Sequence, residues 1–434
     1  MAVLAQDGLD DYSDIWELYG LSENPFSTNP LLVKGGVIPI TCFIGRADEL
    51  VRINKQLRSK GGSRTMIVGN VGVGKTSFVN YARYLAKAKY FSPIKEIHVQ
   101  ESWDSEAFLT NTLFAILNTL TIEGTTSWLD KDTIKQIESI TMLNRISAVG
   151  GGITAGIIGG NYNQETSNPV NIPFLALEEL FVSVINQIYD KQSKETIIHY
   201  NNLENLSEKS VKSVFENLRN TFQTNHVHFV FIGNLMVDGI VQGIPRVASI
   251  FSEHITLDTM SMKEIKEVLQ TRLDKMKIGE IVIKPYDDRV LEVLYELYKG
   301  NIRDILNSLS TAVISATFDK PVLLTDDLLS IILREAVEKR FLANLTPRAK
   351  DVLKIILEAK KGEITNRGIS EISKLDRSNV SSYIHQELEK HSCVYLKRKT
   401  GKDKFWSVRP EIKWMLLNPG PTDVRQSLIK PYVK

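Results

Sequence analysis

One octapeptide constrains the fold of this chain more than any other stretch: GNVGVGKT, at residues 69–76. It matches the pattern G-x-x-x-x-G-K-[ST], in which glycines let backbone N–H groups turn inward around phosphate oxygens. The apolar run TMIVGN leads into it and the amphipathic stretch SFVNYARYLAKA follows it. Such runs are typical of a buried strand and of a helix, so the sequence predicts a strand, a phosphate-binding loop and a helix in that order.

The loop also predicts the cofactor. In this pattern the lysine, Lys75, reaches the β- and γ-phosphates, and the hydroxyl of Thr76 is a ligand for Mg²⁺, so we expect ATP with Mg²⁺. A relic loop that has lost binding is the alternative. The cofactor-binding residues predicted here are Gly69, Asn70, Val71, Gly72, Val73, Gly74, Lys75, Thr76 and Ser77.

Strand and helix patterns alternate through the first half of the chain. Apolar strand runs occur at TIIHY and HVHFVFIGN, with amphipathic stretches such as LALEELFVSVINQIYDK between and around them. This alternation predicts an α/β fold whose parallel sheet is covered on both faces. From Asp258 the pattern is helical, and after Leu345 three short helices precede two alternating strands, the order of a winged-helix domain.

Four parts are therefore predicted. They are an N-terminal lead-in at 1–50, a P-loop core at 51–257 with a glycine-rich insertion at 144–170, an all-helical lid at 258–340, and a winged-helix domain with a tail at 341–434. Within the insertion, the alternation of small and β-branched residues at 148–160 predicts a mobile hairpin, or else a flexible surface loop.

Charge is distributed unevenly along the chain. From Phe341 to the end there are 19 lysines and arginines against 10 aspartates and glutamates, a balance of +9, whereas the rest of the chain carries −7. A basic C-terminal part predicts a polyanion partner, and a merely solvated basic surface is the alternative. The two cysteines are far apart, the N-terminus lacks a basic segment and no apolar run is long enough for a membrane span, so we expect a cytoplasmic protein without membrane contact.

The stretch ETIIHYNNLEN, at residues 195–205, is unusual for a protein that hydrolyses nucleotide. Such a protein needs a carboxylate near the metal and usually a second one to orient water. After the apolar run, however, Asn201 and Asn202 occupy the two expected places, and Glu204 follows. Either Glu204 has become the catalytic acid or hydrolysis is very slow, unless this is an ordinary core strand and the acids lie elsewhere.

Two further residues are candidates for contact with the γ-phosphate. Asn234 ends the strand HVHFVFIGN, and the carboxyl edge of a parallel sheet is where ligands bind. Arg303, in KGNIRDIL, starts a helix of the predicted lid and reaches the triphosphate if the lid folds over the site. The alternatives are a turn asparagine and a solvated arginine.

The predicted winged helix carries a set of candidate DNA contacts. Short polar side chains and one arginine lie along its third helix, which suits a major groove, and cations gather at the hairpin, which suits phosphates. Winged helices also bind proteins, so that alternative stays open. The predicted DNA-binding residues are Arg377, Ser378, Asn379, Ser381, Ser382, Lys397, Arg398, Lys399, Lys402 and Lys404.

Taken in order, these motifs resemble AAA+ ATPases of the origin-recognition initiator type over roughly residues 18–410. GNVGVGKT is similar to their Walker A motif, IIHYNNLE to Walker B, FIGN to sensor 1 and GNIR to sensor 2. ENPF followed by FIGRADEL resembles the segment that contacts the adenine, which implies that Phe43 and Ile44 bind the base. The resemblance also implies an ATP-dependent switch, a helical lid and a DNA-binding winged helix.

Two departures from that family both weaken hydrolysis. The Walker B acids are replaced by Asn201 and Asn202, and Ile250 stands where the family has the arginine that reaches a neighbour's ATP, with Arg246 nearby. We therefore expect an ATP-binding switch that binds double-stranded DNA and assembles partners as a homo-oligomer or with another protein. A signalling or anti-phage defence NTPase whose winged helix binds protein, a transposition-type regulator, and an ATPase motor that uses Glu204 are the alternatives.

Overall fold

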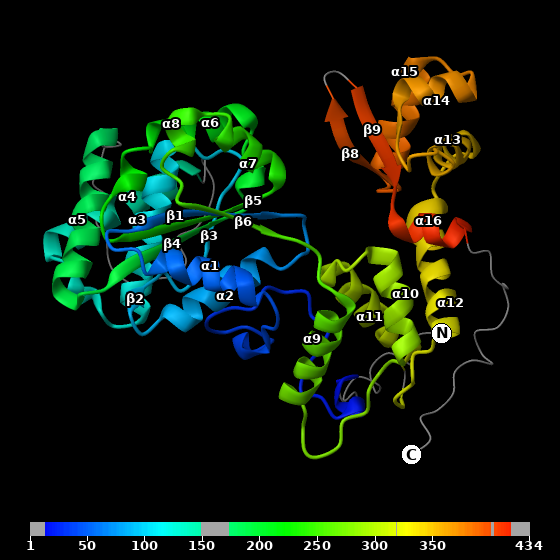
Figure 1. Ribbon diagram of the computed structural model, residues 1–434, viewed down its shortest axis with the longest axis horizontal. Coiled ribbons are helices and arrows are strands. Elements are labelled where there is room, and N and C mark those ends of the chain that lie inside the picture. The colour runs from blue at the N-terminus through cyan, green and yellow to red at the C-terminus, as the bar shows by residue number, and fades with distance from the viewer. Residues whose placement is uncertain (1–13, 149–172, 318, 401–402, 418–434) are drawn as a thin grey trace. The chain divides into compact units, whose positions relative to one another are not determined.

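The computed structural model describes residues 14–148, 173–317, 319–400 and 403–417, and it contains two compact units (Figure 1). The core unit spans residues 29–260. The second unit, called here the helical unit, combines residues up to 28 with those from 261 onward. The predicted lead-in at 1–50 is therefore divided between the two units.

The core unit is built on a parallel sheet. Its main path has the order β2-β4-β5-β1-β6, and β3 also pairs with β4. The strands are β1 (Ser63–Gly69), β2 (Tyr90–Phe91), β3 (Ile97–His98), β4 (Glu195–Asn201), β5 (Val227–Gly233) and β6 (Glu253–Leu257). Because all pairs are parallel, the carboxyl ends of these strands meet at one edge of the sheet.

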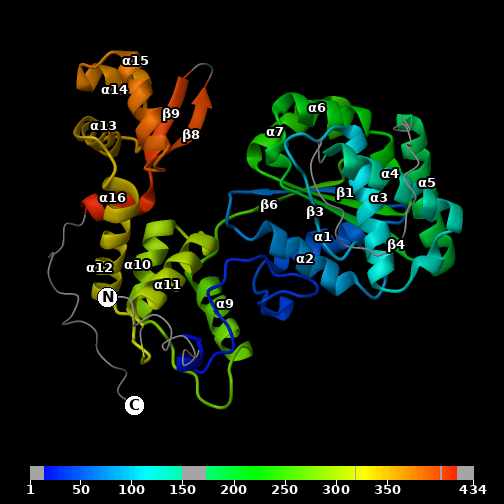
Figure 2. The same cartoon turned by 180° about the vertical axis from the view of Figure 1, so that it is seen from behind.

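Both faces of this sheet are buried. Successive side chains of a strand alternate between faces, and in β5 Phe229 and Phe231 join one hydrophobic cluster while Val230 and Ile232 join the other. The helices are α1 (Ala47–Leu57), α2 (Lys75–Ala86), α3 (Ser105–Ile122), α4 (Lys131–Ala148), α5 (Phe174–Gln192), α6 (Glu208–Asn217), α7 (Leu235–Gln242) and α8 (Pro245–Ala248), with short turns η2 (Ile40–Cys42), η3 (Thr126–Trp128), η4 (Leu203–Asn205) and η5 (Thr221–Gln223). Helices α1 and α2 cover one face, and α3 to α7 cover the other (Figure 2).

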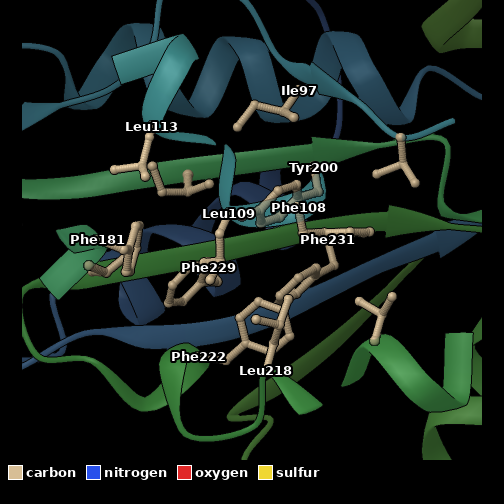
Figure 3. Packing of buried hydrophobic residues seen from close by; sticks show 14 of the residues in the cluster. Ile97, Phe108, Leu109, Leu113, Phe181, Tyr200, Leu218, Phe222, Phe229 and Phe231 are labelled. Atoms are coloured by element: carbon tan, nitrogen blue, oxygen red, sulfur yellow. The ribbon is translucent and has the colours of Figure 1, made fainter. Parts of the chain in front are cut away.

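Aromatic side chains fill the larger of these two clusters. Phe231 stacks parallel to Tyr200 on the neighbouring strand at 5.5 Å, and Phe222 meets it edge-on at 5.0 Å (Figure 3). Phe108 of α3 packs on Tyr200 from above the sheet. These rings are buried almost completely, so this part of the sheet is closed to a ligand and the accessible functional groups lie at the strand ends.

The helical unit contains the predicted lid. Its helices are α9 (Met262–Lys275), α10 (Asp288–Tyr298), α11 (Ile302–Ala316) and α12 (Asp326–Val337), preceded by η1 (Glu17–Tyr19). The side chains of Ser261, Asp287, Asn301 and Thr325 cap the N-termini of these four helices. Tyr19 is fully buried here and its hydroxyl bonds to Thr317 at 2.6 Å, so the N-terminal segment is packed into this unit.

The same unit ends in a small module that starts with η6 (Glu338–Leu342), a π-helical turn. The module continues with α13 (Pro347–Leu357), β7 (Ile364–Thr365), α14 (Asn366–Ser373), α15 (Arg377–Ser382), η7 (Tyr383–Glu389), β8 (Val394–Thr400), β9 (Asp403–Val408) and α16 (Pro410–Leu417). The strands form an antiparallel sheet of order β7-β9-β8 around the buried Trp406. Three helical segments followed by a hairpin is the element order that the sequence predicts.

The predicted fold class is confirmed, with local differences. Strands β2, β6 and β7 and helices α7, α8 and α16 were not predicted. Helix α4 continues to Ala148, so the first residues assigned to the insertion at 144–170 are helical, while the glycine-rich residues 149–170 lie outside the described part of the chain. Over the residues described, no helix combines the length and the apolar character that a membrane span requires.

Candidate nucleotide site

The phosphate-binding loop joins β1 to α2, and its backbone requires glycine at three positions. Gly69, Gly72 and Gly74 all have φ between +89° and +151°, a region that other residues rarely adopt. At Gly69 a Cβ atom would also lie 2.4 Å from the carbonyl oxygen of Leu257. Gly74 forms the N-cap of α2, so the unpaired N–H groups of the first helical turn start at the loop.

Lys75 lies over this loop. Its side chain is 8% exposed, and its Nζ donates to the carbonyl oxygens of Gly69 at 2.8 Å and of Asn70 at 3.0 Å. The ammonium group is thus positioned at the open side of the glycine turn by weak, neutral acceptors. A phosphate oxygen is a stronger acceptor for a cation than a carbonyl group is, so the donor set fits a nucleotide triphosphate.

Thr76 and Asn201 meet, as expected of two residues at the same edge of the sheet. The Nδ2 atom of Asn201 donates to Thr76 Oγ1 at 3.1 Å, and its Oδ1 accepts the backbone N–H of Asn202 at 3.0 Å. Asn201 is 4% exposed, so this amide is fixed in place. It offers the metal position beside Thr76 a neutral group with no negative charge and no basic atom.

Asn202 points elsewhere. Its backbone has φ of 63°, in the left-handed region, and its Nδ2 lies 3.4 Å from Nδ1 of His98 at the end of β3. The two asparagines therefore do not act as a pair at the loop. Asn201 lies beside Thr76, and Asn202 faces the outer strand.

Two other predicted residues lie near this edge. Asn234 follows β5, which runs between β1 and β4, and its Oδ1 caps α7 by accepting the N–H of Val237 at 2.9 Å. Glu204 lies in η4, which packs against β5 and α7. Its Oε2 is buried and has no hydrogen-bond partner among the described residues, which is energetically unfavourable for a carboxylate.

Arg46 is a residue that the sequence analysis missed. It is buried, has φ of 63°, and its Nη2 donates both to Val73 O in the phosphate loop, at 3.4 Å, and to Asp258 O just after β6. It follows the predicted base-contacting residues Phe43 and Ile44, which are half-buried, and Phe43 stacks on Tyr81 of α2 at 4.6 Å. The FIGR sequence contains this arginine, but nothing in the sequence indicates which carbonyl groups it binds.

The phosphate-binding loop also lies within the part of the chain that matches a known protein family. The model of the KAP family P-loop domain matches residues 54–280, which is more than half of the chain and includes the loop, β4 and β5. The chain belongs to the KAP family of P-loop domains. The prediction of a P-loop NTPase is thereby confirmed. Among curated protein sequences, none matches the chain.

Several solved structures are similar to this KAP-family chain at low sequence identity. The ORC2 protein of Aeropyrum pernix in ADPNP–ADP complexes is 16% identical with a TM-score of 0.46, and the alignment covers 90% of this chain and 94% of that one. For the A. pernix ORC1 protein in complex with DNA the values are 16%, 0.43, 87% and 94%. For Cdc6p from Pyrobaculum aerophilum they are 13%, 0.42, 94% and 98%.

The remaining predicted residues lie on other elements. Arg303 is exposed at the start of α11 in the helical unit. Arg246 is exposed on α8, whereas Ile250 packs against the aromatic cluster and cannot replace an arginine. In the C-terminal module, Arg377, Ser378 and Asn379 are exposed on α15, and Ser381 and Ser382 are half-buried.

The hairpin cations of this module are partly neutralised. Glu363 accepts from Arg398 at 2.6 Å and lies 3.5 Å from Lys397, and hydrogen bonding to Arg398 lowers the pKa of this carboxyl. The Arg398 guanidinium also covers the ring of Phe405 at 3.6 Å. Lys404 is exposed, and its backbone lies opposite that of Lys399 in the register of the hairpin. Lys402 lies outside the described residues.

The position of Lys75 yields a direct prediction. Replacing Lys75 with alanine should lower the affinity for ATP by at least about 100-fold, because a charged hydrogen-bond donor to the phosphates is lost. Equilibrium binding of a fluorescent ATP analogue measures this effect. Lys55→Ala, an exposed lysine on α1, is the matched control and should bind like the parent. Equal affinity of Lys75→Ala and the parent would mean that the loop is not the nucleotide site.

Proposed function

We propose that this KAP-family protein binds ATP with Mg²⁺ as a conformational switch, hydrolyses it slowly or not at all, and binds double-stranded DNA through its C-terminal module. The observation that carries the proposal is the contact between Asn201 and Thr76. It puts a neutral amide where a nucleotide hydrolase needs a carboxylate.

The binding half of the site is complete. The glycine turn, the Lys75 ammonium and the Thr76 hydroxyl supply the groups that hold a triphosphate and its metal. When bound, Mg²⁺ would neutralise charge on the β- and γ-phosphates. Asn201 can orient a metal-bound water by hydrogen bonding, but it brings no charge to strengthen that binding.

The hydrolytic half is incomplete. A water that attacks the γ-phosphate must be oriented and deprotonated, and an amide is no base. Glu204 is the carboxylate nearest in sequence, and its Oε2 atom is buried beside β5 and α7 rather than bonded to the loop. Slow turnover follows, so the bound state lasts long enough to serve as a signal.

Arg46 supplies a route by which nucleotide occupancy can change the rest of the chain. It holds a carbonyl of the phosphate loop and the carbonyl of Asp258, where the chain leaves the core unit. When phosphate binding draws the loop inward, Val73 moves and this arginine must adjust. The residues after Asp258 lead directly into α9 and the lid.

DNA binding is supported by charge and by side-chain type. The C-terminal part carries +9, and α15 exposes Arg377 and Asn379, whose side chains suit guanine and adenine edges. Charge alone gives salt-dependent binding to phosphates, and the α15 side chains add contact with the bases.

A second function is favoured by Glu363. Because it pairs with Lys397 and Arg398, two cations predicted to contact phosphates are already partnered. The strand β8 also exposes Tyr395 and Leu396, each 42% accessible. These features suit a protein partner, so ATP-gated assembly with the C-terminal module bound to protein is the second candidate.

Restoring the missing carboxylate tests the switch. Asn201→Asp should raise the rate of phosphate release by about tenfold or more, equivalent to roughly 1.4 kcal/mol of activation free energy, and should make ATP binding more dependent on Mg²⁺. Asn186→Asp on the exposed surface of α5 adds the same charge at a distance and should change neither property. If Asn201→Asp leaves the rate unchanged, Asn201 is not what limits hydrolysis.

A duplex titration separates the two functions. Binding of a fluorescent duplex should weaken steeply with salt and should fall about 30-fold or more in the Arg377→Ala, Asn379→Ala double variant, since each good base contact contributes roughly 1–3 kcal/mol. Arg348→Ala, an exposed arginine on α13, is the control. No salt-dependent duplex binding, together with ATP-dependent assembly in light scattering, would overturn the DNA proposal in favour of the protein-binding one.

A further inference from the structure

The core unit contains a pocket lined by several cations, far from the phosphate loop. It lies where β2 pairs with the first residues of β4, Tyr90 being level with Glu195. Asn201 ends β4 six residues later, about 20 Å away at the rise of an extended strand. The pocket is thus at the amino edge of the sheet, whereas the phosphate loop is at the carboxyl edge. It contains about 240 Å³, space for roughly eight water molecules.

Cations dominate the charged residues of this pocket, called here the Arg83 pocket. Lys34, Arg83, Lys87 and Lys194 line it together with one carboxylate, Glu123. Glu123 pairs with Lys34 at 2.8 Å, which leaves three positive charges without an acidic partner in the lining. Such a concentration of one charge around a small concave volume attracts anions.

Arg83 distinguishes this pocket from a basic surface because its charged side chain is buried. The residue is 4% exposed, and its guanidinium donates to Ser92 Oγ at 2.7 Å, to Asn80 Oδ1 at 2.9 Å and to the carbonyl of Pro93. These acceptors are all neutral. In the described part of the chain Arg83 forms no ion pair, and Glu96 acts on it only at longer range. Burial lowers the pKa of Arg83 to about 10, so it remains charged at neutral pH.

A buried cation whose hydrogen-bond partners are all neutral is unfavourable because it has lost water without gaining a directly bonded opposite charge. A bound anion would offset that cost. The flexible side chains of Lys87, which is exposed, and Lys194, which is half-buried, can close over such an anion from the pocket mouth.

The aromatic side chains that line the pocket also suit a ligand with a planar ring. Tyr90, Phe91 and Trp128 line the pocket, Trp128 meets Phe91 edge-on at 5.9 Å, and Lys194 lies 5.9 Å from the Trp128 ring centre. Aromatic walls beside lysines accept ligands that combine a planar apolar part with a charge. The volume is below the range of about 300–1,000 Å³ that is usual for ligand pockets, so the pocket encloses only part of a ligand of nucleotide size.

We propose that the Arg83 pocket binds a small phosphate-bearing compound with a planar ring, of the size of a nucleoside monophosphate, at a site separate from the phosphate loop. The phosphate lies among Arg83, Lys87 and Lys194, and the ring packs on Trp128 or Tyr90. This site does not depend on the proposed switch, because it shares no residue with the loop.

The test uses full-length Lys75→Ala protein, in which nucleotide binding at the loop is weakened, with AMP, ribose 5-phosphate and adenosine as probes. Calorimetry should detect AMP binding that weakens with salt, weaker binding of ribose 5-phosphate, and none of adenosine. AMP should change the tryptophan fluorescence, and Trp128→Phe should remove that change. Adenosine binding as tight as AMP, or no AMP binding at all, would overturn the proposal.

Lysine variants locate the binding. In the Lys75→Ala background, Lys87→Gln and Lys194→Gln should each lower AMP affinity about tenfold, because each loses a charge-assisted hydrogen bond. Lys212→Gln, an exposed lysine on α6, is the matched control and should have no effect. Arg83 is left intact because it also holds Ser92 and Pro93 in place. AMP binding that is unchanged in both lysine variants would place the ligand elsewhere and contradict the assignment.

Discussion

The complete burial of the central parallel strands is the constraint on which the rest of the structure depends. In β5 and β4 most residues belong to one of two apolar layers, and the polar side chains among them, such as His199 and His228, are buried rather than presented to solvent. Chemistry is confined to the strand ends. At the carboxyl edge these ends bring together the glycine turn after β1, Asn201 after β4 and Asn234 after β5. At the amino edge they leave the Arg83 pocket.

At the carboxyl edge, the phosphate side and the metal side of the proposed site differ in the groups that they offer. In the proposed site, the phosphate side keeps the groups that binding requires, and the backbone there is held by the approach of Gly69 to Leu257 and by the two hydrogen bonds of Arg46. The metal side presents an amide in place of a carboxylate. Binding and turnover depend on different groups, so loss of the second need not weaken the first. A protein of this kind can report whether ATP is present without consuming it.

Much of this arrangement could be predicted from the sequence. The long apolar runs fixed β1, β4 and β5, and the loop motif fixed Lys75 and Thr76, because these signals are local. Strands β2 and β6 were not predicted because they are only two and five residues long, which is too short for a periodic pattern. The side chain of Asn202 faces away from Thr76 because its backbone adopts a left-handed conformation, which the sequence does not reveal. Arg83 is buried through contacts with residues 80, 92 and 93 that only the folded chain brings together.

The central claim is that ATP is held and not consumed, and the rate of phosphate release tests it most directly. Purified protein with saturating ATP and Mg²⁺, with and without duplex DNA, should release phosphate no faster than Lys75→Ala, while equilibrium binding shows that the nucleotide is bound. Turnover near ~1 s⁻¹ or faster would be that of an ordinary enzyme. That result would contradict the switch and make Glu204 the first candidate for the catalytic carboxylate.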